Sequence, residues 1–225
     1  MCFMRLIKMI RDAARYALDT VAPPDPTVRR IEEMSVTEFL RQVVPDERET
    51  REDSIVAFFP YRTDLMKAAL VELKTFRNRN IERLVGTIVC ERLIELALAR
   101  KASDDFDNPL LVPVPMTRKS LRKRGWNQCE LIVREITRED KGKMMEMRTD
   151  VLVKIRETAD QVGRTRSERI DNQRNCLAAS DGVDIKGRNV IVLDDIVTTG
   201  ATLREAQRAL LQAGARAVIC VAVAY

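Results

Sequence analysis

The chain has 225 residues, of which 45% are apolar and 32% are charged, and its formal net charge is +5. This composition is typical of a folded protein with a sizeable core and argues against disorder. Histidine is absent, which excludes nucleophilic sites activated by histidine and zinc sites ligated by histidine. Aromatic residues make up only 4%, which argues against direct nucleic-acid binding on a platform of stacked rings.

The five cysteines are scattered along the chain, and no Cys-x-x-Cys pair occurs. Reduced thiols are therefore expected, with neither a disulfide framework nor a zinc site, as is typical of a cytoplasmic protein. Arg5, Lys8 and Arg11 interrupt the first apolar stretch, so it does not resemble a secretory signal. No apolar stretch is long enough to span a bilayer, and no membrane span is expected.

The first 53 residues predict a helical segment. Apolar residues recur at helical spacing from Phe3 to Val21, and the prolines within 23–26 end this amphipathic helix. Its apolar face can pack on the protein's own core, on a second copy in a homodimer or, since its polar face is basic, on a membrane surface. Ser35-Val36-Thr37-Glu38 has capping-box spacing and predicts the start of a second helix. Residues 44–53 are charged and without periodicity, which is typical of a linker.

From residue 54 onward, apolar strands alternate with amphipathic helices. Strands are expected at 54–59, 110–115, 151–153, 190–193 and 217–223, and helices at 64–76, 81–99, 121–136 and 203–211. The last two strands are continuous apolar runs separated by a helix, which predicts a right-handed crossover between parallel strands of a buried sheet. We therefore expect an α/β domain over 54–225, preceded by the small segment over 1–53.

The turn between the last two strands carries the clearest functional signal. It reads Asp194-Asp195-Ile196-Val197-Thr198-Thr199-Gly200-Ala201-Thr202. Ligands of parallel sheets bind where strands end, and backbone N–H groups at a helix N-terminus suit a phosphate. Successive strand residues point to opposite faces, so both carboxylates can serve one ligand only if the chain leaves the pleat here. A ribose 5-phosphate fits both parts of this segment, with its hydroxyls at the aspartates and its phosphate at the residues that follow. A simple helix cap with two solvated aspartates does not explain why the segment is so long.

This nonapeptide resembles the 5-phosphoribosyl-1-pyrophosphate (PRPP) signature of type I phosphoribosyltransferases. The resemblance implies a central, mostly parallel sheet flanked by helices, with a small N-terminal hood segment. It also implies that Asp194 and Asp195 act as catalytic residues that bind the ribose hydroxyls. The resemblance also implies that the loop after these aspartates binds PRPP, chiefly at the 5-phosphate. The loop residues are Val197, Thr198, Thr199, Gly200, Ala201 and Thr202.

Further segments resemble the ComF family within that class. The matching segments are Leu73-Lys74-Thr75-Phe76-Arg77, Pro113-Val114-Pro115-Met116, Arg124-Gly125-Trp126-Asn127-Gln128 and the polar positions from Thr158 to Asn172. On the pyrophosphate side, the resemblance implies Lys74, Pro115, Met116 and Arg124. Gln161 and Arg169 would belong to a flexible loop that closes over the substrate. ComF proteins usually begin with a four-cysteine zinc motif, which is replaced here, so zinc is not expected.

Other conspicuous residues have simpler explanations. Five cations lie within 118–124, of which Arg124 is expected to be functional, whereas Lys119 and Lys123 are equally typical of a solvated helix face. Trp126 is predicted to be a packing anchor rather than a base-stacking platform. Cys129 and Cys220 are predicted to be small core residues.

The resemblance implies an enzyme that binds PRPP with Mg²⁺ and transfers the phosphoribosyl group to a nitrogen nucleophile, with release of pyrophosphate. The acceptor would be nucleobase-like, and Mg²⁺ would arrive with PRPP rather than on direct protein ligands. Two alternatives stay open. The first alternative to an enzyme is a sensor, which binds PRPP or a nucleotide and does not turn it over. The second is an accessory protein of competence and DNA uptake. The sequence identifies neither the acceptor nor the oligomeric state.

Overall fold

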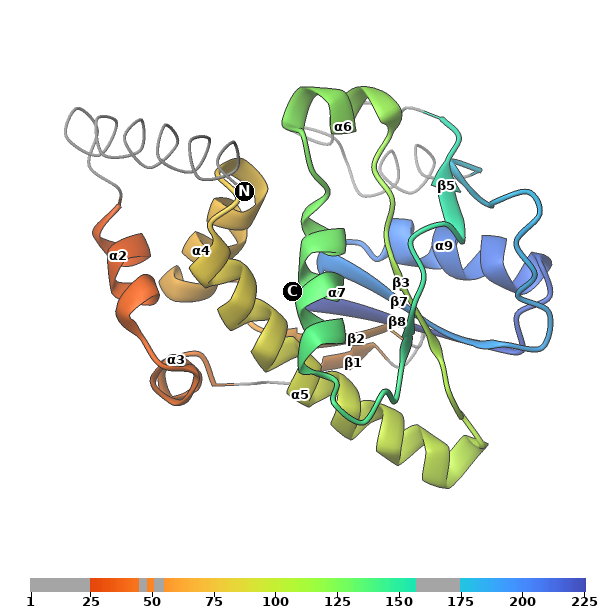
Figure 1. The fold of residues 1–225 in the computed structure, drawn as a ribbon, viewed down its shortest axis with the longest axis horizontal. Coiled ribbons are helices and arrows are strands. Elements are labelled where there is room, and N and C mark those ends of the chain that lie inside the picture. Colours follow the sequence, from red (N-terminus) through yellow and green to blue (C-terminus); the bar gives the residue numbers. More distant parts are fainter. Residues whose placement is uncertain (1–24, 45–47, 51–54, 157–174) are drawn as a thin grey trace, which may run out of the picture.

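The computed structural model describes residues 25–44, 48–50, 55–156 and 175–225 (Figure 1). The amphipathic helix predicted between Phe3 and Val21 lies outside the described residues, and so do the predicted loop residues Gln161 and Arg169.

The described strands form one central sheet and a separate two-stranded sheet. The central sheet has the order β1-β2-β8-β7-β3-β4. Its strands are β1 (Arg48–Thr50), β2 (Ile55–Phe59), β3 (Leu110–Pro113), β4 (Glu146–Met147), β7 (Asn189–Ile196) and β8 (Ala217–Ala224). Every pairing is parallel except that of β1 with β2. Strands β5 (Leu152–Lys154) and β6 (Leu177–Ala179) form the antiparallel pair. The expected mostly parallel sheet is confirmed.

The prediction of a linker over 44–53 is wrong for its central part. Residues Arg48–Thr50 form β1, which pairs antiparallel with β2 at the edge of the sheet, with Arg48 opposite Ala57 and Thr50 opposite Ile55. Edge strands are short and commonly charged, so they lack the apolar alternation by which strands are predicted from sequence.

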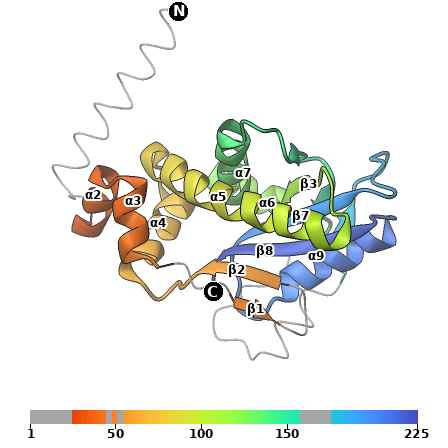
Figure 2. The ribbon, with the colours of Figure 1, turned by 90° about the horizontal axis from the view of Figure 1, so that it is seen from below.

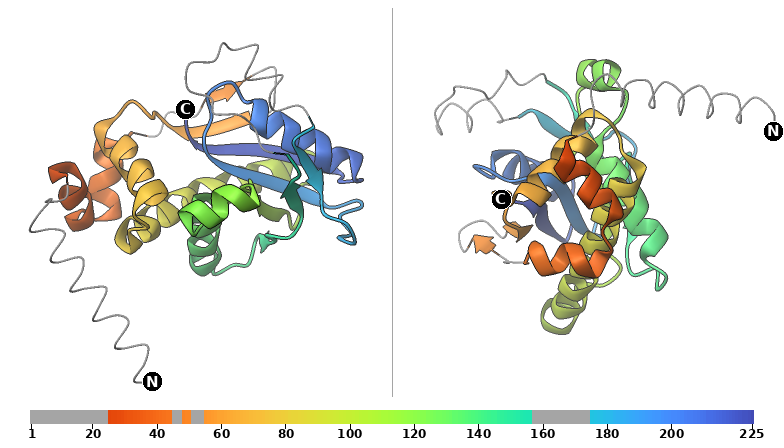
Figure 3. Two further views of the ribbon diagram at one scale, coloured as in Figure 1. Left: turned by 90° about the horizontal axis from the view of Figure 1, so that it is seen from above. Right: turned by 90° about the vertical axis from the view of Figure 1, so that its left-hand side faces the viewer.

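Helices cover both faces of the central sheet (Figure 3). The helices in the described ranges are α2 (Pro26–Glu33), α3 (Val36–Gln42), α4 (Asp64–Thr75), α5 (Arg79–Asp104), α6 (Arg118–Arg124), α7 (Gln128–Glu139) and α9 (Ala201–Gln212). Ile191 and Leu193 of β7 belong to one core with the helices α5 and α7. Val190 and Val192 belong to a second core with α9. This alternation confirms that β7 is buried on both faces, as its continuous apolar run predicts.

The helix predicted over 121–136 is wrong in one respect, because two helices occupy this region. Gly125, at φ 88°, ends α6 in the left-handed conformation that glycine adopts without steric cost. The Asn127 Oδ1 atom then accepts a hydrogen bond from the Cys129 N–H at 3.0 Å and starts α7. The break matters because it places Gln128 and Cys129 in the first turn of a new helix.

The N-terminal helices α2 and α3 pack beside α4 and α5 at one end of the molecule (Figure 2). The capping box predicted at Ser35 is confirmed, since its hydroxyl accepts from the Glu38 N–H and the Glu38 carboxylate accepts from the Ser35 N–H. Buried residues of this segment, such as Ile31 and Phe39, share the core that also contains Leu193 of the sheet. The domain boundary at 53/54 therefore stays a prediction.

No helix within the described ranges combines the length and the apolar character that crossing a bilayer requires.

Candidate functional site

Asp194 and Asp195 lie at the point of the sheet where the connections after two neighbouring parallel strands leave on opposite faces. After β3 the chain continues into α6 and α7, while after the neighbouring β7 it continues into α9 on the opposite face. Such a switch point leaves a crevice at the carboxyl ends of the two strands, where parallel α/β sheets bind ligands. Pairing between β3 and β7 ends at Pro113 and Leu193. Asp194 and Asp195 therefore follow directly at an open strand edge.

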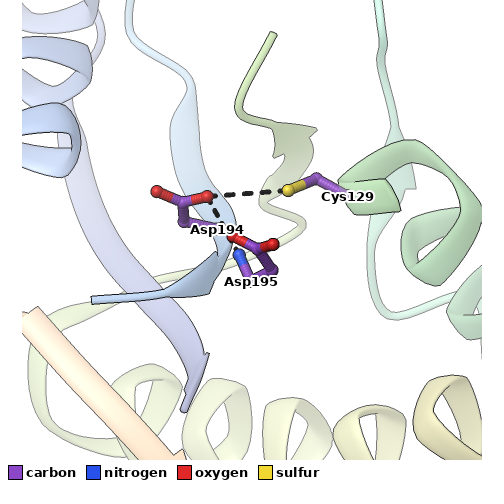
Figure 4. A group of neighbouring side chains, drawn as sticks. All are labelled: Cys129, Asp194 and Asp195. Atoms are coloured by element: carbon purple, nitrogen blue, oxygen red, sulfur yellow. Dashed lines mark hydrogen bonds between the residues drawn. The ribbon is translucent and has the colours of Figure 1, made fainter. Parts of the chain in front are cut away.

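The expectation that the chain must leave the pleat at the aspartates is wrong. Strand β7 continues to Ile196, with Asp194 opposite Ala222 and Ile196 opposite Ala224 of β8. The two carboxylates nevertheless meet, because Asp194 Oδ1 bends back to accept the backbone N–H of Asp195 at 2.9 Å (Figure 4). One oxygen of each carboxylate and the Cys129 Sγ atom all lie within 4.8 Å of one another.

Asp195 is buried and held at both carboxylate oxygens. Its Oδ1 atom accepts the backbone N–H of Ile196 at 2.9 Å, and its Oδ2 atom accepts from the Gln128 side-chain amide at 2.9 Å. Gln128 is itself buried in the first turn of α7. The orientation of Asp195 is therefore fixed from two sides by donors of the chain.

Asp194 has a different environment. Burial, followed by the negative charge of Asp195, raises the pKa of the Asp194 carboxyl to about 8. Burial and then the charges of Asp195 and Asp194 raise the pKa of the Cys129 thiol well above its ordinary value. Cys129 is therefore a thiol, a weak donor that lies 3.6 Å from Asp194 Oδ1. A hard cation such as Mg²⁺ prefers ionised oxygen ligands, so neither the protonated thiol nor the Asp194 carboxyl below about pH 8 is a good direct ligand for it.

The raised pKa of Asp194 predicts a pH-dependent stability. In the unfolded chain this carboxyl ionises near pH 4, whereas in the folded protein it keeps its proton up to about pH 8. The free energy of unfolding should therefore fall as the pH rises between these values, by at most about 1.4 kcal/mol per pH unit. Urea unfolding of the wild type and of Asp194→Asn from pH 4 to pH 9 tests this. The wild type should lose stability relative to the variant as the pH rises, and parallel curves would contradict the assignment.

The loop after β7 presents backbone donors. The Val197 N–H bonds to the Ala224 carbonyl at 2.8 Å, which ties the start of the loop to β8. Among the described residues, the N–H groups of Thr198, Thr199 and Gly200 have no hydrogen-bond acceptor. Thr198 is exposed, and Gly200, at φ 72°, begins α9. These donors at a helix N-terminus form an arrangement that suits a phosphate, as expected from the sequence.

The loop is held in shape by its own polar groups. The Ala201 N–H approaches the Thr199 hydroxyl at 3.4 Å, and the Arg204 guanidinium donates to the Thr199 carbonyl. Thr202 lies half-buried in the first turn of α9, and Ala201 is buried.

The residues predicted for the pyrophosphate side are brought together only in part. Arg124 Nη1 lies 3.7 Å from the sulfur of Met116 and 2.6 Å from Gln128 Oε1, so Arg124 and Met116 connect to Asp195 through Gln128. Pro115 is half-buried between β3 and Met116. Lys74 is exposed in the last turn of α4 and has no hydrogen bond or ion pair within the described part of the chain.

Two ComF-like segments are joined directly. The Trp126 indole N–H donates to the Leu73 carbonyl at 2.9 Å, which links the turn before α7 to the last turn of α4. This contact supports the prediction that Trp126 is a packing anchor. The predictions for Cys129 and Cys220 are confirmed in that both are buried. The additional contact of the Cys129 thiol with Asp194 was not predicted.

Sequence analysis also missed Gln128 as a site residue. It forms part of the Arg124–Gln128 segment, of which only Arg124 was predicted to belong to the site. The signal that could have found it is its position as the first residue of a helix that follows a glycine turn, next to the strand ending in aspartates. That signal becomes visible only when the break at Gly125 is recognised.

A family model matches the part of the chain that carries the aspartates and the loop. The model of the phosphoribosyl transferase domain matches residues 129–225, which include α7, β7, the loop, α9 and β8. A hypoxanthine phosphoribosyltransferase from Staphylococcus aureus is a structural neighbour with a TM-score of 0.34 and 12% identity, over 63% of this chain and 61% of that chain.

Curated relatives are similar over part of their length. Competence protein ComFC of Bacillus subtilis is 32% identical over 110 residues, which are 49% of this chain and 41% of that protein. DNA utilization protein YhgH of Escherichia coli K12 is 27% identical over 147 residues, or 65% of this chain and 61% of that protein. The match thus spans less than two thirds of either relative. Together with the family model, these relatives support the resemblance predicted from the sequence: over the parts that match, the chain is similar to ComF-type proteins and to the phosphoribosyl transferase domain.

Proposed function

We propose that this protein is a phosphoribosyltransferase that binds PRPP with Mg²⁺ and transfers the phosphoribosyl group to a nitrogen nucleophile, with release of pyrophosphate. The observation that carries the proposal is the order of the chemical groups at the end of β7, where acidic side chains are followed by backbone N–H donors. Two carboxyl groups that approach each other are followed by a loop whose N–H groups at Thr198, Thr199 and Gly200 find no acceptor in the described part of the chain. Carboxylates accept hydrogen bonds from a sugar diol, and the N–H groups suit its phosphate.

The residues would share the chemistry as follows. Asp194 and Asp195 orient the ribose and stabilise the positive charge that develops on it while the bond to pyrophosphate breaks. The loop from Val197 to Thr202 holds the 5-phosphate, so the reacting carbon is fixed between the nucleophile and the leaving group. Mg²⁺, brought by PRPP, would neutralise charge on the departing pyrophosphate.

The other parts of the proposal follow from the same site. Lys74, Pro115, Met116 and Arg124 would contribute to the pyrophosphate side, and Gln161 and Arg169 to a loop that covers the substrate. The acceptor would be nucleobase-like. We infer a cytoplasmic protein that holds no zinc and does not bind nucleic acid directly. The apolar face of the amphipathic helix predicted from Phe3 to Val21 would give it a surface for a homodimer.

A second candidate function is non-catalytic. The relatives are named as competence and DNA utilization proteins rather than as transferases. This favours a protein that binds PRPP or a nucleotide and acts as a sensor or as an accessory of DNA uptake. Such a protein would use the same carboxylates and the same loop for binding.

An assay of pyrophosphate release separates the two functions. Purified protein with PRPP and Mg²⁺ is offered each nucleobase in turn, and pyrophosphate is measured alongside calorimetric binding of PRPP. Release that depends on one acceptor supports the transferase. Saturable PRPP binding without release for any base supports the sensor, and the absence of PRPP binding contradicts both.

A further inference from the structure

Gln128 connects a cation to the acidic pair. Its Oε1 atom accepts from Arg124 Nη1 at 2.6 Å, and its Nε2 atom donates to Asp195 Oδ2 at 2.9 Å. Gln128 and Asp195 are both buried, and Arg124 is half-buried. The contact with Asp195 bridges 67 positions of sequence, from the first turn of α7 to the end of β7.

Arg124 determines which end of the Gln128 amide faces Asp195. A guanidinium has donors only, so the atom of Gln128 that faces it must be the carbonyl oxygen. The amide nitrogen is then turned towards Asp195, where it can only donate. The orientation of this amide, which is ambiguous for an isolated glutamine, is therefore fixed by its cationic neighbour.

Gln128 in turn restricts Asp195. The Asp195 Oδ1 atom is occupied by the N–H of Ile196, and Oδ2 is occupied by the Gln128 amide. Without Gln128, the side chain of Asp195 would keep contacts only to its neighbours in sequence among the described residues, namely the Ile196 N–H and the Asp194 carboxyl. A buried carboxylate that loses such a donor loses both a fixed orientation and a favourable interaction.

We propose that Gln128 is a positioning residue, which Arg124 orients and which holds the Asp195 carboxylate in the direction needed to receive a ribose hydroxyl. This inference rests on the proposed function and deepens it. It gives Arg124 a role on the acidic pair in addition to any contact with pyrophosphate. It also makes the glycine turn at Gly125 part of the site, since this turn allows Arg124 and Gln128 to face each other from two helices.

Two variants separate positioning from mere packing. Gln128→Met keeps the length of the side chain and removes both hydrogen bonds. Gln128→Glu keeps an acceptor for Arg124 but presents a second carboxylate to Asp195 in place of the donor. Gln207→Met is the matched control. The side-chain amide of Gln207 in α9 also donates a hydrogen bond, to the backbone carbonyl of Val218 in β8 at 3.2 Å. Melting curves establish that each variant is folded.

The probes are ribose 5-phosphate and inorganic phosphate, whose dissociation constants are measured by NMR titration with each full-length variant. Inorganic phosphate needs only the loop, whereas ribose 5-phosphate also needs the carboxylates. Gln128→Met should lower the affinity for ribose 5-phosphate about tenfold or more, as expected for a lost hydrogen bond to a charged group. Its affinity for inorganic phosphate, and both affinities of Gln207→Met, should stay within about twofold, since these contacts are untouched.

The glutamate variant decides the mechanism. If Gln128 only packs against Arg124, Gln128→Glu will bind ribose 5-phosphate like the wild type, and the inference is overturned. If Gln128 positions Asp195, Gln128→Glu will lose at least as much affinity as Gln128→Met. If the wild type prefers ribose 5-phosphate over inorganic phosphate and both Gln128 variants keep that preference, the role of Gln128 is overturned and the proposed function stands. A wild type that binds neither probe overturns the proposed function as well.

Discussion

Replacing Asp194 and Asp195 together by alanine should abolish the stabilisation of the protein by PRPP and Mg²⁺. In the wild type, ligand at about 100 times its dissociation constant should raise the free energy of unfolding by about 2.7 kcal/mol. The double variant lacks the carboxylates that bind the ribose, so its melting temperature should not respond to PRPP. The substitutions also delete two acidic groups that are unfavourable so close together, one of them half-buried and the other buried. The melting temperature of the double variant without ligand should therefore equal or exceed that of the wild type.

The matched control is Asp181→Ala combined with Asp184→Ala. Both residues are exposed in the segment that precedes β7, so this control removes the same number of carboxyl groups near the opposite end of the strand. It should keep the full response to PRPP. A double variant of the acidic pair that still responds fully would show that these residues do not form the site.

Replacing Gly200 by alanine should impair both stability and phosphate binding. Gly200 lies at φ 72°, a conformation that costs an L-residue about 1–2 kcal/mol. A Cβ atom there would also lie 2.7 Å from Ile55 Cδ1 and 3.0 Å from Arg204 Nη1. Overpacking of this kind adds about 1–3 kcal/mol. The shift of the loop that relieves the contact should lower the affinity for PRPP by about tenfold or more, because phosphate binding requires aligned N–H groups.

Gly187 provides a close control for the backbone term. It has the same φ of 72°, and a Cβ atom added there meets nothing within 4 Å. Gly187→Ala should therefore cost only the conformational term and leave PRPP binding unchanged. Introducing Ile55→Val, which deletes the contacting Cδ1 atom, should make Gly200→Ala less costly than it is in the wild type. Urea unfolding and calorimetry measure these differences. Equal losses for Gly200→Ala and Gly187→Ala would show that the close contact is not significant.

Much of the fold could be predicted from the sequence because the central strands are buried on both faces. Val190–Leu193 and Ala217–Val223 are uninterrupted apolar runs, which distinguish buried parallel strands from amphipathic ones. The edge strand β1 was not predictable in this way, because no periodic apolar pattern marks it. The break at Gly125 was also missed, since α6 contains a single apolar residue, Leu121, and so has no apolar pattern that would mark its end.

The candidate site was predictable where one continuous segment carries the chemistry. Asp194, Asp195 and the loop through Thr202 follow one another in the chain, so their residue types and spacing were sufficient. Gln128 and Cys129 reach the same carboxylates from 67 and 65 positions away. Their roles depend on how α7 packs against β7, and a single sequence does not show that packing. The bend of Asp194 towards Asp195 accompanies a hydrogen bond from the Asp195 N–H, which residue types and spacing do not show either.

A crystal structure of the complex with PRPP and Mg²⁺ tests the central claim most directly. The account predicts that the oxygens of the 5-phosphate lie about 3 Å from backbone nitrogens between Thr198 and Thr202. It also predicts that the ribose hydroxyls lie at hydrogen-bond distance from Asp194 and Asp195. A structure in which PRPP occupies another surface, with neither carboxylate within reach of the sugar, would contradict it.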